Sequence, residues 1–139
     1  MSKRVLAVDY GTKRTGLAIG DDEMRMASPL GAIATRGREA LVEAIAGVVE
    51  REGIDQIVVG LPLNMDGTAG PMVEAAMALA EVLRQRTGVP VDVFDERLTS
   101  HAAEGLFAGT EFTKAQRQKR IDALAAMILL QSYLDQPNP

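Results

Sequence analysis

Three acidic residues stand where a carboxylate could do chemistry. Asp9 ends the apolar run 5–8, Glu96 follows the apolar run 91–94 closely, and Asp122 lies beside the apolar stripe of the last predicted helix. Carboxylates are costly to bury unpaired, and three together repel one another unless a cation lies among them. Carboxylate oxygens suit Mg²⁺ or Mn²⁺. Two such ions about 4 Å apart can hydrolyse a phosphodiester, one activating water and the other stabilising the leaving oxygen. We therefore predict Asp9, Glu96 and Asp122 as metal ligands and catalytic residues, with two ions between them.

Taken singly, each of these acids has a simpler explanation, and Asp122 could be an ordinary residue at the edge of its helix stripe. Asp9 could cap a turn, which is a common role of aspartate. Glu96 could pair with Arg97 at the surface, where such pairs contribute little. Asp95 precedes Glu96, and strand alternation would turn it to the other side of the sheet. The metal-site hypothesis is favoured by the combination of the three acids, not by any one of them.

Possible nucleic-acid contacts lie close to the acids in the sequence. Gly11 could take a positive φ and let a phosphate approach the backbone, and Lys13 and Arg14 could hold phosphates. Asn64 lies in a polar loop after a predicted strand, where it could line the site. Arg97 could contact phosphate or lock its own loop by a salt bridge. Gly11 and Asn64 could equally serve only to shape their turns. Lys13 and Arg14 could be solvated turn residues, but the adjacent acid favours function, whereas the salt bridge is the favoured role of Arg97.

A basic patch precedes Asp122. Its members are Lys114, Arg117, Lys119 and Arg120. A charge run is usually a solvated helix face, and Asp122 could simply pair with Arg117 or Lys119. Because the patch leads directly into a predicted metal ligand, we favour contact with a nucleic-acid backbone. Only 4% of the residues are aromatic, so base stacking cannot be the main mode of binding.

Apolar periodicity and turn residues predict the elements that position these groups. Strands are expected in the runs 4–9, 15–20, 55–61 and 91–94, and in part of 24–33. Helices are expected over 36–51, ended by Gly53, over 71–87, beginning at Pro71, from Thr99 or Ser100 to 107, and over 115–134. The first two strands form a hairpin, whereas strand–helix–strand alternation predicts parallel neighbours. The sequence therefore predicts an α/β fold whose mixed sheet is antiparallel in its first part.

The composition sets outer limits on the function. With 139 residues, the chain most simply forms a single domain, 1–139. It has no cysteine and one histidine, which excludes thiolate and His-rich zinc sites. We see no signal peptide and no apolar run of about 20 residues, so we expect a cytoplasmic protein without membrane contact. The net charge of −4 argues against a general polyanion-binding surface but leaves local basic patches open.

Four ordered motifs resemble the YqgF/RuvX family. They are VDYGTKRTGLAIGD (8–21), VVGLPLNMDGTAGP (58–71), FDERLTS (94–100) and KRIDALAAMILLQSYLD (119–135). This family is described as Holliday junction resolvases and as nucleases that mature the end of pre-16S ribosomal RNA. The resemblance covers nearly the whole chain and implies a ribonuclease H-like fold with a five-stranded mixed sheet and flanking helices.

The resemblance also implies an activity and its partners. It implies a metal-dependent hydrolase acting on phosphodiesters, and it places the family's acidic residues on Asp9, Glu96 and Asp122. We expect processing of the 5′ end of pre-16S rRNA, with contact to ribosomal precursor particles. Cleavage of branched DNA, as by a Holliday junction resolvase, is the alternative substrate. The sequence leaves open whether the protein is a monomer or a homodimer.

Two other functions remain as hypotheses. The segment 9–12, DYGT, resembles the first phosphate loop of actin-like ATPases, but those enzymes close two lobes on ATP and this chain has the length of one. A non-catalytic nucleic-acid adaptor could use the same fold without chemistry. The presence of all three acids argues against the adaptor.

Overall fold

A five-stranded mixed sheet forms the centre of the protein. The computed structural model describes residues 2–64, 66–98 and 113–136. Within them the strands are β1 (Arg4–Asp9), β2 (Arg14–Asp21), β3 (Met26–Ala34), β4 (Gln56–Leu61) and β5 (Val91–Asp95). Their order is β3-β2-β1-β4-β5. β1–β2 and β2–β3 are antiparallel, whereas β1–β4 and β4–β5 are parallel. The predicted mixed sheet is confirmed, including the antiparallel arrangement of its first three strands.

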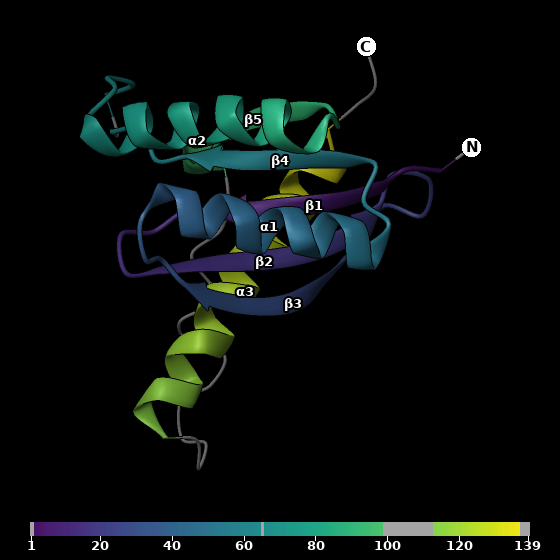
Figure 1. The fold of residues 1–139 in the computed structure, drawn as a ribbon, viewed down its shortest axis with the longest axis horizontal. Coiled ribbons are helices and arrows are strands. Elements are labelled where there is room, and N and C mark those ends of the chain that lie inside the picture. Colours follow the sequence, from purple (N-terminus) through teal and green to yellow (C-terminus); the bar gives the residue numbers. More distant parts are fainter. Residues whose placement is uncertain (1, 65, 99–112, 137–139) are drawn as a thin grey trace.

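Helices cover both faces of this sheet. α1 (Arg38–Glu52) and α2 (Pro71–Thr87) pack on one face through a core that includes Leu41, Ile45 and Leu79. α3 (Lys114–Leu134) packs on the other face through Leu129 and Leu130. Figure 1 shows α1 in front of the sheet and α3 behind it, with the first turns of α3 extending past β3. No helix among the described residues is long and apolar enough to cross a membrane.

The predicted boundaries of these elements agree with the observed ones to within two residues. α2 begins at Pro71 and α1 is ended by Gly53, both as predicted, and Gly53 has a left-handed conformation. In α3, Ala123 is buried and Ala125 is not, so the buried stripe is rotated slightly from the predicted one. The predicted helix from Thr99 or Ser100 to 107 lies outside the described residues.

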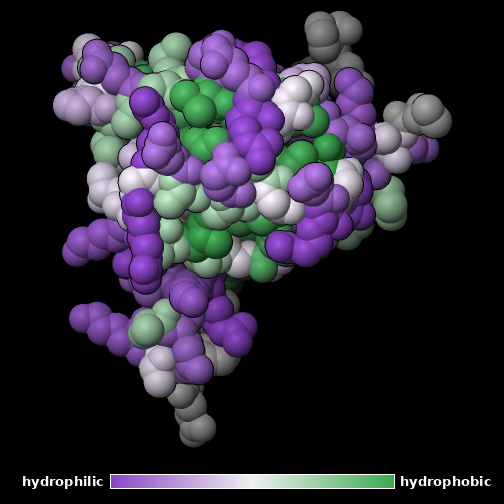
Figure 2. All heavy atoms as spheres, in the orientation of Figure 1, coloured by the Kyte–Doolittle hydropathy of each residue, from purple (hydrophilic) through white to green (hydrophobic). Residues whose placement is uncertain are grey.

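Small residues on one sheet face allow α3 to approach closely. Ala7 and Ala18 are fully buried under it. A Cβ built on Gly20 of β2 would lie 3.0 Å from side-chain atoms of both Leu130 and Leu134. The helix therefore packs nearly against the strand backbone. Its protruding first turns are mainly hydrophilic, as Figure 2 shows below the sheet.

Candidate active site at the carboxyl ends of the central strands

Asp9 lies between two glycines on the neighbouring strands. It pairs with Gly16 of β2. On the other side the parallel register pairs Val8 with Val59, so Gly60 of β4 is the next residue beside Asp9. Side chains that lie side by side across a sheet point to the same face. Since Val5 and Ala7 pack in the core beneath α3, alternation turns Asp9 to that face as well.

Gly60 makes room for the second acid. A Cβ built on Gly60 would lie 2.8 Å from Cγ and 2.9 Å from the carboxyl carbon of Glu96, and closer still to one carboxylate oxygen. Glu96 opens the short 3₁₀ turn Glu96–Leu98 directly after β5, as the sequence predicted. It shares a hydrogen bond with Asp9. Burial, followed by that hydrogen bond and the negative charge of Asp9, raises the pKa of Glu96 to about 9. The two carboxyl groups thus form a half-buried pair.

Gly16 makes room for the helix that carries the third acid. A Cβ on Gly16 would lie 2.7 Å from the carbonyl carbon of Asp122 and would overlap its oxygen. The backbone of α3 at Asp122 therefore rests against the residue that pairs with Asp9. Thus the fold brings all three predicted acids to one end of the central strands, on the face covered by α3.

The side chain of Asp122 is held by a cation of the chain itself. Arg14 donates from Nε to Oδ2 of Asp122 at 2.7 Å, and Gln118 donates to Oδ1 at 3.2 Å. The simple alternative for Asp122, a pair with Arg117 or Lys119, is therefore wrong in its partner, because Arg14 comes from β2, 108 positions away. Arg14 was predicted to hold phosphate, and here it neutralises a carboxylate. The pair is partly exposed, at 36% for Arg14 and 19% for Asp122.

Two of the three predicted ligands, Asp9 and Glu96, lie where they could bind a hard divalent cation. Asp9 and Glu96 offer oxygen ligands in mutual contact. Burial of Glu96 and the negative charge of Asp9 raise the pKa of Glu96, and a bound cation would offset both effects. Among residues 2–64, 66–98 and 113–136, no group of three metal-ligating side chains is close enough to hold an ion. Asp122 would join such a site only by exchanging Arg14 for the metal.

The β1–β2 turn is shaped by close backbone approach. The expectation of a positive φ at Gly11 is wrong, since Gly11 is not among the residues with positive φ. It is instead required because a Cβ there would overlap the carbonyl of Arg14. Thr35 ties the turn down by bonding to the carbonyls of Gly11 and Lys13, at 2.8 and 2.9 Å. The side chain of Lys13 is left on an exposed turn beside the acids.

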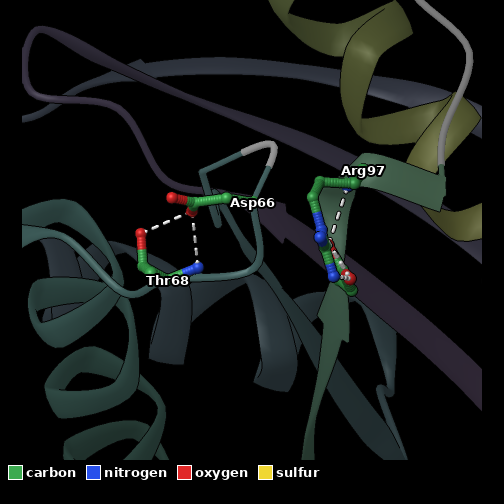
Figure 3. A network of polar contacts seen from close by, with 4 residues as sticks. Asp66, Thr68 and Arg97 are labelled. Atoms are coloured by element: carbon green, nitrogen blue, oxygen red, sulfur yellow. Dashed lines mark hydrogen bonds and ion pairs between the residues drawn. The ribbon is translucent and has the colours of Figure 1, made fainter.

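Arg97 and the β4–α2 loop form a neighbouring polar network (Figure 3). Arg97 donates to both carboxylate oxygens of Asp95, at 2.7 to 3.1 Å, and this lowers the pKa of Asp95. In the loop, Asp66 accepts from the backbone and hydroxyl of Thr68, which lowers the pKa of Asp66. Asn64 donates to the same hydroxyl at 3.0 Å. The predicted salt-bridge role of Arg97 is thus observed, while nucleic-acid contact by Asn64 and Arg97 stays a prediction.

The predicted basic patch lies on the exposed first turns of α3. The helix begins with a capping box between Thr113 and Gln116. The patch residues that follow are all exposed: Lys114, Arg117, Lys119 and Arg120. Their role in binding nucleic acid stays a prediction.

Gly16 and Gly60 are the functional positions that sequence reasoning missed. A signal existed, because an isolated glycine in a strand often marks close approach of another group. Recognising their role needed the strand register, which places both of them beside Asp9.

Comparison with known proteins identifies the family. The family model described as "RuvX: Holliday junction resolvase" matches residues 3–136. The chain belongs to the RuvX family. Curated relatives extend this membership: a "Putative pre-16S rRNA nuclease" of Anaeromyxobacter sp. (strain Fw109-5) is 44% identical over 95% of this chain and 96% of its own length. One of the same name from Chloroflexus aurantiacus (strain ATCC 29366 / DSM 635 / J-10-fl) is 41% identical over 94% of this chain and 86% of its own.

Solved structures of other proteins share the fold of this chain. RuvC of T. thermophilus, in complex with a Holliday junction substrate, superimposes with a TM-score of 0.60 and 18% identity over 94% of each chain. The fowlpox virus Holliday junction resolvase gives a TM-score of 0.57 and 17% identity over 95% of this chain and 98% of its own. The predicted ribonuclease H-like fold is confirmed.

Proposed function

We propose that this RuvX-family protein is a metal-dependent endonuclease that processes the 5′ end of pre-16S rRNA. The observation that carries the proposal is the hydrogen-bonded pair of Asp9 and Glu96 at the carboxyl ends of two strands that flank β4. Such a pair is unfavourable unless a proton or a cation lies between the two groups. The names of the curated relatives support the choice of RNA substrate.

Asp9, Glu96 and Asp122 would hold the divalent ions. When bound, Mg²⁺ or Mn²⁺ would supply an activated water and stabilise the leaving oxygen. The chain itself fixes the ligands: β1 sets the position of Asp9, and Gly60 lets Glu96 reach it. Arg14 neutralises Asp122 and keeps its carboxylate at the site edge. Once Asp122 is released, the guanidinium of Arg14 is free to bind a substrate phosphate, its predicted role.

The cationic side chains around the acids would hold the nucleic-acid backbone. Lys13 is exposed on the turn that follows Asp9, and the basic patch of α3 leads into Asp122. Contacts of this kind fix the position of a strand without reading its sequence. The proposed division of work is therefore phosphate positioning by cations and hydrolysis at the acids.

A cleavage assay tests the proposal directly. The purified protein is incubated with a 5′-extended fragment of pre-16S rRNA in Mg²⁺, in Mn²⁺ and in chelator. We expect cleavage only with metal, and none from Asp9→Asn that folds normally by circular dichroism. Asp135→Asn, an exposed acid at the end of α3, serves as the matched control and should cleave normally. Full activity of Asp9→Asn, or equal cleavage in chelator, contradicts the proposal.

Holliday junction resolution is the second candidate. It is favoured by the description of the matching family model. A four-way DNA junction and the rRNA fragment, offered side by side at equal concentration, distinguish the two candidates. Symmetric nicking of the junction with no RNA cleavage would replace the first proposal by the second.

A further inference from the structure

A groove of about 430 Å³ lies beside the candidate active site, between the edge strand β3 and the first half of α3. The apolar part of its lining comes from Pro29, Leu30, Ala32 and Leu124. Lys119 and Arg120 of the basic patch supply its cationic part. The groove is therefore an apolar depression with positive charge on one side.

An irregularity in β3 shapes this groove. β2 pairs Leu17 with Gly31 but Ala18 with Pro29, so Leu30 is left without a partner in the register. This is the geometry of a β-bulge, which re-aims a side chain at a sheet edge. Leu30 stays 38% exposed although it is large and apolar. Lys119, Arg120, Ala123 and Leu124 of α3, which crosses β3 in Figure 1, form the opposite wall.

The groove lies in line with the acids. Ala32 of β3 pairs with Gly16, and Gly16 pairs with Asp9, so the three residues form one row across the sheet. Two interstrand spacings separate Ala32 from Asp9, roughly 10 Å between backbones. Because the backbone of α3 rests on Gly16 between them, a substrate strand that reaches from the acids to the groove follows a longer path around the helix. The other wall belongs to the helix that carries Asp122.

The chemistry of the lining indicates the occupant. A nucleotide combines an apolar base face with an anionic phosphate, which matches apolar walls flanked by Lys119 and Arg120. A volume of about 430 Å³ lies within the usual size of small-ligand sites. In an intact duplex the bases are stacked and paired, so they cannot enter such a groove without being extruded. The complementarity therefore favours a nucleotide outside a duplex.

We propose that this groove binds one unpaired nucleotide of the substrate strand, away from the cleaved phosphate and on the β3 side of α3. Its base lies against Leu30, Ala32 and Leu124, and its phosphate lies on Lys119 or Arg120. The proposal rests on the nuclease function above and adds a substrate class: a duplex that ends in, or is interrupted by, unpaired nucleotides.

A binding experiment tests the groove separately from cleavage. All variants carry Asp9→Asn, so that no substrate is cut. Fluorescence anisotropy gives Kd for a blunt RNA duplex and for the same duplex with a three-nucleotide unpaired tail. Burial of an apolar base face against aliphatic side chains favours binding, so we expect the tail to tighten binding about tenfold. Ala32→Trp, which fills the groove, should remove the advantage of the tail and leave binding of the blunt duplex unchanged.

Further variants guard against misfolding. Leu30→Glu adds a carboxylate at an already exposed position and should repel the phosphate, with the same loss of tail advantage. Met77→Trp and Met77→Glu are matched controls on α2, where Met77 is 53% exposed, and both should keep the advantage. Equal Kd for tailed and blunt duplexes overturns the proposal, as does a tail advantage that survives in both groove variants. Cleavage by the parent protein is measured in parallel: its absence refutes the nuclease function, whereas cleavage without tail preference refutes only the groove.

Discussion

Replacing Gly16 by alanine tests whether the close contact between β2 and α3 builds the active site. The added Cβ would lie 2.7 Å from the carbonyl carbon of Asp122, whereas ordinary contact begins at 3.4 Å. Backbone atoms cannot rotate away as a side chain can. Helix and strand must therefore separate by roughly 0.7 Å or more, the difference between these two distances. Overpacking of this kind costs about 1–3 kcal/mol of stability.

The same displacement would move Asp122 away from Asp9. A misplacement of about 1 Å can lower a rate by roughly 10²-fold. We therefore expect Gly16→Ala to unfold at a lower urea concentration and to cleave the precursor RNA about 100-fold more slowly. The assays are urea unfolding followed by circular dichroism and initial cleavage rates in saturating metal.

Two other glycines make this prediction specific. Gly47 lies on the exposed side of α1, with open space around its would-be Cβ, so Gly47→Ala should stabilise the protein by about 1 kcal/mol and leave cleavage unchanged. Gly60→Ala would contact side-chain atoms of Glu96, which can rotate, so it should lose activity with less loss of stability than Gly16→Ala. Wild-type stability and activity in Gly16→Ala would refute the reasoning, because the measured contact would then have no consequence.

Three further outcomes are expected. The pKa of Glu96 is raised from its unfolded value of 4.5 to about 9, so the folded state holds an extra proton between these pH values. The stability of the metal-free protein should therefore fall as the pH rises through this window. Urea unfolding at the two ends of the pH window should show a smaller difference for Glu96→Gln, and an unchanged difference would contradict the assignment. Arg14→Gln should cost about 1 kcal/mol or less, because the pair is partly exposed, yet it should increase the rise in Tm caused by Mn²⁺, because Asp122 no longer has to exchange a partner; a smaller rise would mean that Arg14 helps to build the metal site. Thr113→Ala should lower stability by about 1 kcal/mol through loss of the capping box of α3, and an unchanged Tm would show that this cap contributes nothing.

The sequence was sufficient to predict where Asp9 and Glu96 meet. Each acid follows a short apolar strand, and parallel strands place such ends at one edge of a sheet. This inference needs only the order of strands and helices, which apolar periodicity reveals. The position of Asp122 beside the buried stripe of α3 followed from helical spacing in the same way.

The state of Asp122 could not be predicted from the sequence. Its partner Arg14 lies 108 positions away, and their contact depends on how closely α3 packs on β2. The helix can approach the strand because Gly16 and Gly20 have no side chains. The importance of these two glycines is seen only once the strand register is known. The bulge at Leu30 was hidden for a related reason, since one unpaired residue leaves no mark in an apolar pattern.

The docking of α3 also bears on the order in which the protein becomes active during folding. β1 and β2 form a local hairpin, but Asp122 joins the other two acids only after α3 closes a long loop onto β2. That contact joins Arg14 to Asp122 across 108 positions. Closing such a loop costs entropy that local contacts do not, so the hairpin should form before the helix docks. A chain still emerging from the ribosome would therefore carry Asp9 and Glu96 without Asp122. If the protein is the proposed nuclease, such a nascent chain cannot cut the RNA around it, because hydrolysis requires the complete fold.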